Sequence, residues 1–362
     1  MQQPSAVASA AAFALGLLAA ACGGDHPPAA SRAADQPVSP PASHERVYVT
    51  NEDSEDLSVI DGVTDSVIAT IPVGTRPRGV HVGPDGRVFV ALSGSPKCPP
   101  SMPDAECARL TADKSKDGIA VVDIQARRVE RILPGGSDPE NFAVSADGAR
   151  LFVSNEDANA ASIVDVATGR IVATVPVGRE PEGVGVRPGT SEVWVTGETD
   201  HDVTILDGSD GRDGPVLGRV VVDRRPRNVA FSPDGGTAYV SAEVGGTLSI
   251  IDAAARRVVA TIPFGTGAKP MGIAVSRDGS RLYVTTGRGG TVAVIDPAAR
   301  RILGTVAVGP RPWGVALSTD GRRLYTANGP SGDVTVVDVA TLSVLRRIPV
   351  GKMPWGVAIG AR

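Results

Sequence analysis

Short runs of β-branched and other apolar residues, separated by polar turns, fill most of the chain. One stretch shows the pattern in full, with four runs at Leu151–Asn155, Ala161–Asp165, Ile171–Val177 and Gly183–Val186. Apolar and polar positions alternate within the runs, as they do in a strand that buries one face. Residues that favour turns, such as Gly, Asn and Asp, separate the runs. The stretch therefore predicts four short antiparallel strands.

The same pattern recurs along the chain at intervals of roughly 40–45 residues. Its seven openings are Val47-Tyr48-Val49, Val88-Phe89-Val90, Leu151-Phe152-Val153, Val193-Trp194-Val195, Ala238-Tyr239-Val240, Leu282-Tyr283-Val284 and Leu324-Tyr325-Thr326. Four-stranded repeats of this length are typical of one architecture, in which each repeat is a blade around a central channel. We therefore predict an all-β, seven-bladed β-propeller with four antiparallel strands in each blade.

The two ends of the repeat region complement each other. The chain finishes at Pro354–Ile359 with an innermost strand, whereas the region starts at Val47–Thr50 with a second strand that lacks an innermost one. We expect the ends to build one blade together, with one strand from the C-terminus and three from the N-terminus. Closing the ring in this way removes the exposed edges of an open sheet.

Two polar series repeat with the blades and are expected to be architectural. An aspartate at the end of each third strand can bond the backbone of the following turn, and the series is Asp61, Asp123, Asp165, Asp207, Asp252, Asp296 and Asp338. Asp-Gly pairs between the first and second strands provide residues that tolerate a positive φ, at Gly86, Gly148, Gly235, Gly279 and Gly321.

The charge balance argues against one class of partner. The chain has 36 Lys and Arg against 40 Asp and Glu, a formal net charge of −4. No basic stripe stands out, so we expect no nucleic-acid binding, which depends on positive charge along a phosphate backbone.

The N-terminal segment predicts export. An apolar run at Ala6–Ala21 is too short for a comfortable membrane span, and it leads into Ala-Cys22-Gly-Gly, which resembles a bacterial lipoprotein signal. The preceding MQQPS lacks the Lys or Arg usual in such signals, and the alternative is a buried Ala-rich helix. We expect a periplasmic or cell-surface protein attached to the membrane only through lipid on Cys22. The expected regions are a signal at 1–22, a disordered Pro/Ala/Ser tether at 23–45 and the propeller at 46–362.

The second repeat carries a large insertion at 93–117, which should emerge on the face described below as the channel mouth. Cys98 and Cys107 lie eight residues apart within it. In an exported protein this spacing favours a local disulfide. Neither a haem-attachment motif nor a closed zinc site can be built from these cysteines.

The repeats resemble the YVTN family of β-propellers over essentially everything after the tether. The residues that carry the resemblance are Tyr48-Val49-Thr50-Asn51, Ser58-Val59-Ile60-Asp61 and Val67–Gly74, together with the equivalent residues of the other six repeats. Several stretches also look like the subgroup of PQQ-dependent catabolism-associated β-propeller proteins, namely Asp138–Phe142, Phe152–Asp157, Glu180–Gly183 and Pro354–Val357. The resemblance implies an exported seven-bladed propeller found beside periplasmic quinoprotein oxidation systems, with no agreed catalytic residues.

Positions that differ between blades are the candidates for function. The loops that lead into the innermost strands should gather at one channel mouth, where the residue after each loop proline is Arg78, Glu140, Glu182, Arg227, Met271, Trp313 or Trp355 in ring order. Such a mouth suits an amphipathic ligand or a polypeptide loop. Alternatively, Arg and Glu simply pair around the rim and the tryptophans cover the channel end. The candidate binding residues are Arg76, Arg78, His81, Glu140, Asn141, Glu182, Arg227, Asn228, Met271, Arg311, Trp313 and Trp355.

His81 and the carboxylates that follow the second strands are further candidates for function. His81 fills a slot that is Ala or Gly in the other innermost strands, so it either binds a ligand or is merely accommodated. Carboxylates after the second strands, including Glu52, Glu156, Glu198 and Glu243, could hold a cation or act as acid and base. They have no EF-hand spacing and sit on different blades, in loops where carboxylates are usually solvated. We therefore expect no metal site.

These observations lead to a functional hypothesis and an alternative. The leading hypothesis is a non-catalytic, monomeric extracytoplasmic binding or scaffold module without a cofactor, which engages a protein or small amphipathic ligand as an accessory to quinoprotein-dependent oxidation. The alternative is a lactonase-like hydrolase in which Glu140 or Glu182 works with His81. No nucleophile elbow or phosphate loop occurs in the sequence.

Overall fold

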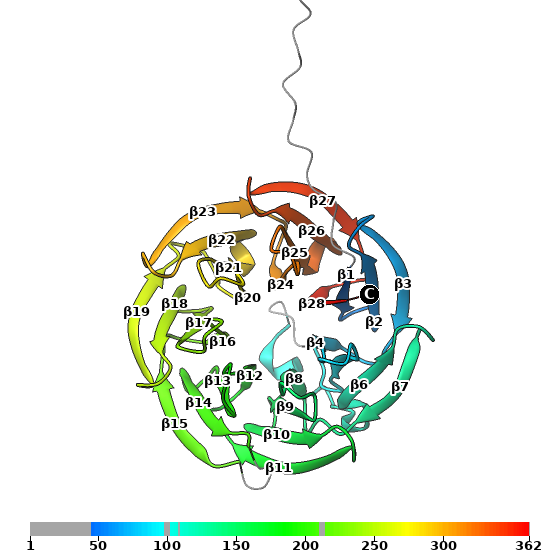
Figure 1. Ribbon diagram of the computed structural model, residues 1–362. Helices are drawn as coiled ribbons and strands as arrows, with labels where there is room; N and C mark the ends of the chain where they lie inside the picture. The colour runs from blue at the N-terminus through cyan, green and yellow to red at the C-terminus, as the bar shows by residue number, and fades with distance from the viewer. Residues whose placement is uncertain (1–44, 98–101, 108, 210–213, 362) are drawn as a thin grey trace, which may run out of the picture. The chain divides into compact units, whose positions relative to one another are not determined.

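Seven four-stranded antiparallel sheets form a closed ring (Figure 1). The computed structural model describes residues 45–97, 102–107, 109–209 and 214–361. The ring belongs to the unit that spans residues 41–362. The predicted all-β, seven-bladed β-propeller is confirmed.

Each blade has four strands ordered from the channel outward. The innermost strands are β28 (Pro354–Ala361), β4 (Pro77–Val82), β8 (Pro139–Val144), β12 (Pro181–Val186), β16 (Pro226–Phe231), β20 (Ile273–Val275) and β24 (Pro312–Leu317). The second strands are β1 (Glu45–Asn51), β5 (Val88–Leu92), β9 (Arg150–Asn155), β13 (Glu192–Gly197), β17 (Thr237–Ala242), β21 (Leu282–Thr285) and β25 (Arg323–Asn328).

The two outer positions of each blade follow the same order. The third strands are β2 (Asp56–Asp61), β6 (Gly118–Asp123), β10 (Ala160–Asp165), β14 (Asp202–Asp207), β18 (Thr247–Asp252), β22 (Thr291–Asp296) and β26 (Asp333–Asp338). The outermost are β3 (Ser66–Pro72), β7 (Arg128–Leu133), β11 (Arg170–Pro176), β15 (Val216–Val221), β19 (Arg257–Pro263), β23 (Arg301–Ala307) and β27 (Ser343–Pro349). Four short helical turns complete the described chain, namely α1 (Asp104–Cys107), η1 (Lys114–Lys116), η2 (Gly287–Gly289) and η3 (Gly329–Ser331).

The first blade is shared between the two ends of the chain, as predicted. Strand β28 pairs with β1, with Val47 opposite Ile359 and Val49 opposite Val357. A side-chain contact across the closure adds to this pairing, because Thr319 donates its backbone N–H and its hydroxyl to Glu45. Because of this closure, each blade of the described ring lies between two neighbouring blades, and the ring has no open end.

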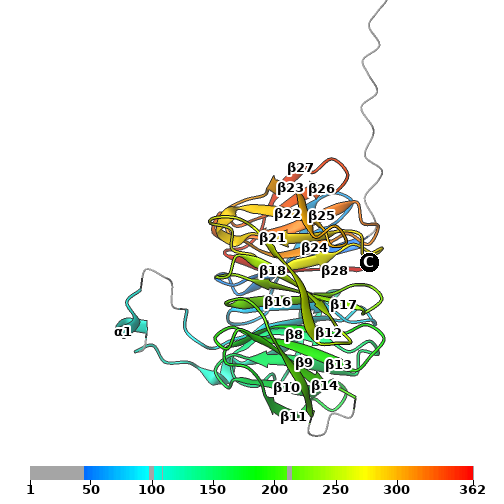
Figure 2. The same ribbon diagram turned by 90° about the vertical axis from the view of Figure 1, so that its left-hand side faces the viewer.

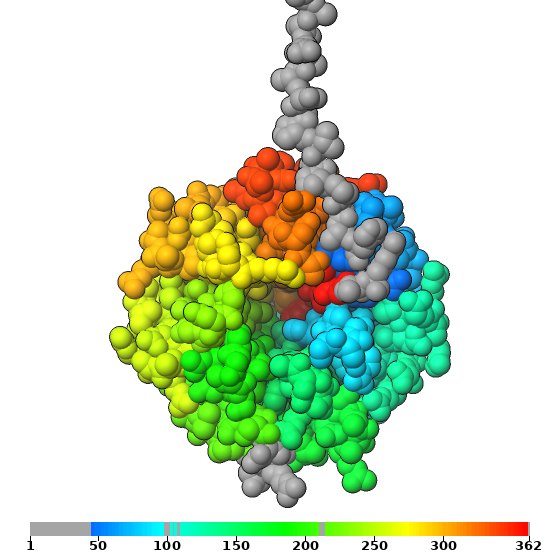
Figure 3. All heavy atoms as spheres, in the orientation of Figure 1, coloured from blue at the N-terminus to red at the C-terminus, as the bar shows by residue number. Residues whose placement is uncertain are grey.

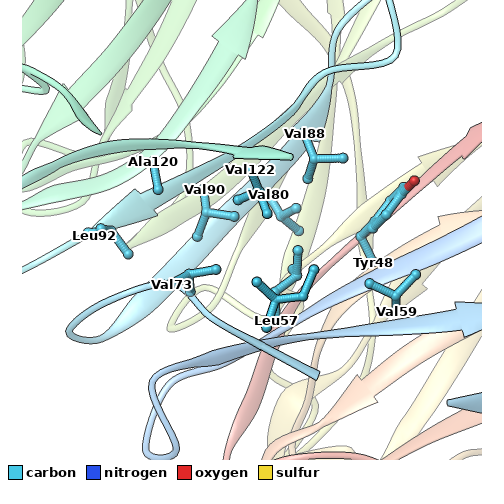
Figure 4. Packing of buried hydrophobic residues seen from close by; sticks show 11 residues of the cluster. Tyr48, Leu57, Val59, Val73, Val80, Val88, Val90, Leu92, Ala120 and Val122 are labelled. Carbon is cyan, nitrogen blue, oxygen red and sulfur yellow. The ribbon is translucent and has the colours of Figure 1, made fainter. Parts of the chain in front are cut away.

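The apolar core lies between blades rather than within them. One cluster joins Tyr48 and Leu57 of the first blade to Val88 and Val90 of the second (Figure 4). Each of the other clusters likewise combines residues of two neighbouring blades. Because a four-stranded sheet cannot bury both its faces alone, each blade depends on its neighbours for stability.

The repeated aspartates have the predicted architectural role. Asp165 Oδ1 accepts a hydrogen bond from the backbone N–H of Thr168 at 2.8 Å, and its counterparts in the other blades cap the same turn. The glycines of the Asp-Gly turns all have positive φ, between 69° and 81°.

The insertion of the second blade projects from the face opposite to the one toward which β28 ends (Figure 2). Asp117 accepts a hydrogen bond from the Gly94 N–H at 2.7 Å and closes the base of the insertion. Lys97 then contacts Glu52 at 3.1 Å, and the Glu52 N–H donates to the Met353 carbonyl at 3.0 Å. The insertion therefore lies on the same face as the start of β28, where Trp355 is, as expected.

Several predictions fall outside the residues that the structure describes. These are the signal and tether, including Cys22, and the disulfide, because Cys98 and the side chain of Cys107 are not described. Among the described residues, no helix is long and apolar enough to span a bilayer.

Candidate functional site

A repeated hydroxyl fixes the innermost strands at the channel mouth. The Thr50 hydroxyl of β1 accepts the Gly356 N–H of its own blade at 2.9 Å and donates to the Arg78 carbonyl of the next blade at 2.6 Å. Ser154, Ser241 and Thr285 donate in the same way to the carbonyls of Glu182, Met271 and Trp313. The backbone of the residue after the loop proline is thereby anchored in four of the blades, and this sets where its side chain starts.

Close approach of neighbouring innermost strands explains the glycines that follow the mouth residues. A Cβ on Gly314 would lie 2.6 Å from the Trp355 carbonyl oxygen and 2.9 Å from the Val357 nitrogen. Gly183, Gly272 and Gly356 face equally close backbone atoms of the next blade. In two blades the position is Asn141 or Asn228, and both side chains line the channel.

The innermost strands enclose a cavity of about 240 Å³ at the centre of the ring. Eight of the predicted binding residues line it, namely His81, Asn141, Glu182, Arg227, Asn228, Met271, Trp313 and Trp355. The other four, Arg76, Arg78, Glu140 and Arg311, are not among its lining residues. On the opposite face, where β28 ends, a hollow is visible at the centre of the ring (Figure 3).

One side of the cavity is aromatic. The rings of Trp313 and Trp355, from the adjacent strands β24 and β28, lie 5.5 Å apart. The guanidinium of Arg227 lies 5.6 Å from the Trp313 ring, and that of Arg78 lies 5.9 Å from the Trp355 ring. Arg311, outside the cavity, stacks on Trp313 at 5.1 Å. Trp355 Nε1 is buried and donates no hydrogen bond within the described part of the chain.

A first ionic cluster surrounds Arg78. Its guanidinium contacts Glu140 and, at 3.3 Å, Glu52, which also binds Arg76 and Lys97. Burial by itself would raise the pKa of Glu52, but the three basic groups together outweigh burial and hold that pKa to about 2. Glu52 therefore stays ionised, and through Arg76, which donates to the Ser95 carbonyl, the cluster reaches the base of the insertion.

A second ionic cluster surrounds Arg227. It contacts Glu182 at 2.6 Å and also Glu198, which in turn accepts a hydrogen bond from Arg225 at 2.6 Å. Burial raises the pKa of Glu182, and the nearby charges of Arg227 and Arg78 offset this only in part. Arg and Glu thus do pair around the rim, as one of the two sequence interpretations expected, while Glu182 and Arg227 also face the cavity.

His81 points into the channel. Its Nε2 lies 3.3 Å from Asn141 Oδ1, and its ring makes an edge contact with Phe142 at 4.8 Å between centroids. Burial lowers the pKa of His81, because the charged imidazolium is poorly solvated there. The side chain is therefore a neutral imidazole at neutral pH, available to the cavity.

Sequence reasoning undervalued the carboxylates that follow the second strands. They were expected to be solvated, yet Glu52 and Glu198 are only 4% and 3% exposed. Each is the principal partner of an arginine at the mouth. Their place directly after the strand, repeated in four blades as Glu52, Glu156, Glu198 and Glu243, was the available signal. It was missed because adjacent loops from neighbouring blades cover them, which no single repeat reveals.

Comparisons with known proteins support the fold but do not establish a family. The family model described as the Cytochrome D1 heme domain matches residues 237–357, about a third of the chain. A search of curated proteins gives no significant match.

Solved structures of propeller proteins are similar over most of the chain. Hydrazine synthase from Kuenenia stuttgartiensis has a TM-score of 0.68 and 20% identity, covering 86% of this chain and 99% of that one. Candidate 6-phosphogluconolactonases from Bacteroides fragilis and Bacteroides uniformis have TM-scores of 0.71 and 0.70, with 15% and 17% identity. These two cover 88% of this chain, and 98% and 100% of their own chains. At such identities the likeness shows the fold alone.

The family description raises the question of a haem, which the channel does not fit. Haem iron takes an axial His, Cys, Met or Tyr ligand. The matched segment 237–357 contains neither histidine nor cysteine, and its tyrosines Tyr239, Tyr283 and Tyr325 are buried in the clusters between blades. Of the possible ligand types among the described residues, only Met271 and His81 line the cavity, and His81 contacts Asn141. The cavity of about 240 Å³ is also smaller than the roughly 300–1,000 Å³ usual for pockets that enclose a drug-sized ligand.

Proposed function

We propose that the protein is a non-catalytic binding module that holds a small amphipathic ligand at the mouth of its channel. One observation carries the proposal: the two sides of the cavity differ in chemistry. Met271, Trp313 and Trp355 come from three consecutive blades, and Asn141 and Glu182 come from the blades across the ring. Aromatic rings supply contact area, while amide and charged groups supply directional hydrogen bonds.

An unpaired donor on a residue that lines the cavity narrows the chemistry of the ligand. Buried polar groups normally have a partner, and an exception calls for an explanation. The Trp355 indole N–H is such an exception among the described residues. A ligand that places an oxygen acceptor beside an apolar group would satisfy this donor and cover the Trp313 ring. The small volume of the cavity favours a small molecule over a polypeptide loop.

The tryptophans themselves provide the test. The chain has three, and Trp194 is fully buried in the cluster between the fourth and fifth blades, so a Trp194→Phe background leaves the two at the mouth as fluorophores. A panel of small aromatic and aliphatic carboxylic acids and alcohols is titrated against this protein. We expect a saturable fluorescence change that Trp313→Ala weakens by about tenfold or more, close to 1.4 kcal/mol.

The matched control for this titration is Arg256→Ala, which removes a partly buried arginine that lies between β18 and β19, pairs with Glu192 at 2.8 Å and does not line the cavity. It should bind like the parent protein. A ligand whose affinity is unaffected by Trp313→Ala, or equally reduced by Arg256→Ala, would contradict binding at the mouth.

A hydrolase is the second candidate, favoured by the raised pKa of Glu182 and by a neutral His81 that lines the same cavity. A carboxyl with a raised pKa can act as a general acid, and a neutral imidazole can act as a base. The candidate 6-phosphogluconolactonases among the similar structures give a substrate class to try. Lactone hydrolysis that is lost in both Glu182→Gln and His81→Ala, with ligand binding retained, would replace the non-catalytic proposal. Absence of hydrolysis in the parent protein removes this candidate.

The YVTN resemblance supports a further, finer proposal about location. We propose an exported protein, anchored by lipid on Cys22 and accessory to a quinoprotein-dependent oxidation in the periplasm. Labelling of cells with a radioactive fatty acid should mark the parent protein and not Cys22→Ser. Equal labelling of both, or of neither, would remove the anchor from the proposal.

A further inference from the structure

Three carboxylates of one blade converge beside the channel mouth. Asp138 and Glu140 flank the proline that starts β8, and Glu156 directly follows β9. Pairing of Pro139 with Asn155, and a hydrogen bond from the Glu156 N–H to the Asp138 carbonyl at 3.1 Å, hold the two segments together. Each side chain offers one oxygen, and these oxygens lie within 4.8 Å of one another.

Glu140 provides the second observation. Its side chain is fully buried, and its Oε1 accepts no hydrogen bond from any described donor, while Arg78 faces the other oxygen. Leaving a buried carboxylate oxygen without a partner costs more than the roughly 1–3 kcal/mol of a neutral group. A buried carboxylate oxygen without a partner therefore indicates that a further group, such as an ion, binds here.

The basic residues nearby do not fully neutralise the charge of the three carboxylates. Arg78 serves Glu52 as well as Glu140, so it does not neutralise the three carboxylates by itself. Lys114 forms ion pairs with Asp157 and Asp117, and both Lys114 and Arg76 act on Asp138 through electrostatic attraction without an ion pair to it. Burial raises the pKa of Glu156, and the charge of Arg78 reduces this effect without cancelling it. Ionised together, the three carboxylates repel one another, and positive charge placed between them would relieve the repulsion.

We propose that Asp138, Glu140 and Glu156 bind a hard divalent cation, with Ca²⁺ preferred over Mg²⁺. Carboxylate oxygens are the ligands that such cations take. Ca–O distances of about 2.3–2.6 Å allow ligand oxygens to lie up to about 5 Å apart around one ion, and the three oxygens here lie within 4.8 Å of one another. Mg–O distances of about 2.0–2.1 Å in a strict octahedron would demand a tighter cluster. The proposal does not rest on the proposed ligand, since these oxygens lie outside the aromatic side of the cavity.

The test is calorimetric titration of the chelator-treated full-length protein with CaCl₂ and, separately, with MgCl₂. We expect one Ca²⁺ per chain with a dissociation constant of about 1 mM or lower, the range of extracellular Ca²⁺ sites. Glu156→Gln should weaken Ca²⁺ binding by about tenfold or more. Glu243→Gln, which removes a mouth carboxylate outside the cluster, should bind Ca²⁺ as the parent does.

Each contrary outcome decides against the proposal. No saturable Ca²⁺ binding in the parent protein, or equal affinity in Glu156→Gln, would overturn the site. Tighter binding of Mg²⁺ than of Ca²⁺ would overturn the choice of ion. Because Glu140→Gln touches a buried ion pair and could unfold the blade, Asp138→Asn is the second cluster variant, with circular dichroism as the check on folding. If Glu243→Gln lost as much affinity for Ca²⁺ as Glu156→Gln, the ion would be attracted by the overall negative charge of the mouth and not bound by the three carboxylates.

Discussion

Glu52 illustrates how a single buried carboxylate can hold a functional surface in place. It touches Arg76, Arg78 and Lys97, and so connects the channel mouth to the base of the insertion. Burying a charge is costly unless it is paired, and breaking such a pair leaves the partners uncompensated. Geometry at the mouth therefore depends on a residue that does not itself line the cavity.

This arrangement gives the stability of the propeller a specific pH dependence. The pKa of Glu52 is about 2 in the folded protein and ordinary in the unfolded chain. The unfolded state therefore binds more protons between these values, and the contribution of Glu52 is present above its ordinary pKa and lost as the pH falls towards 2. By linkage that contribution is on the order of 3 kcal/mol.

We expect Glu52→Gln to lower the free energy of unfolding at pH 7 and to lower it progressively less between about pH 4.5 and 2. Urea denaturation of the parent and the variant across this range measures the difference. Glu130→Gln, which makes the same change at an exposed glutamate of the outermost strand β7, is the control. A difference between Glu52→Gln and the parent that is independent of pH would contradict the pKa assignment.

At the scale of the elements, the innermost strands of neighbouring blades approach one another closely, backbone against backbone. Their glycines face backbone atoms of the next blade, which cannot move aside as a flexible side chain can. The hydroxyls of Thr50, Ser154 and Thr285 then tie each strand to the next. The mouth side chains consequently project from a rigid collar, as precise binding requires.

A matched pair of glycine substitutions tests this packing. Gly314→Ala in β24 should lower the free energy of unfolding by about 1–3 kcal/mol, because the new methyl group overlaps the Trp355 carbonyl. Gly304→Ala in the outermost strand β23 meets its nearest atom, on Leu342, at 3.9 Å and should be nearly neutral. Thermal unfolding of both variants measures the difference, and equal losses would show that the collar is not the tight region.

At the scale of the whole propeller, stability depends on the contact between the two ends of the repeat region. Strand β28 contributes Val357 and Ile359 to a cluster that also holds Val47 and Tyr325. That cluster joins the seventh blade to the first, so it supplies both the hydrogen bonds and the apolar packing of the closure. In a closed ring every blade has two neighbours, so loss of the closure exposes an apolar blade face at each end.

Removal of β28 should therefore affect the entire ring. A chain that ends at Gly351 is expected to lose cooperative thermal unfolding, and a synthetic peptide of residues 352–362 should restore it. The same peptide with Val357→Asp and Ile359→Asp should fail, because charges would enter an apolar cluster. Cooperative unfolding of the truncated chain without any peptide would contradict closure by β28.

The strand pattern could be predicted from the sequence because it is local and repeated. The alternation within Leu151–Asn155 and the equivalent strands requires only that each strand bury one face. Because the pattern occurs seven times, a strand that is ambiguous in one repeat can be assigned from the others. Even the shared blade followed from counting strands at the two ends. The mouth side chains Trp313 and Trp355 were found in the same way, since they occupy equivalent positions in consecutive repeats.

The tertiary structure alone decided which of those side chains meet and how deeply they are buried. Glu52 and Arg78 come from adjacent blades, and Asp138 and Glu156 meet only because β8 and β9 pair in register. Burial and the pKa of a carboxylate depend on groups distant in sequence, so no repeat taken by itself contains that information. The repeating strand pattern of the sequence determines the blades. Which side chains meet at the mouth depends on how the closed ring places loops of different sequence next to one another.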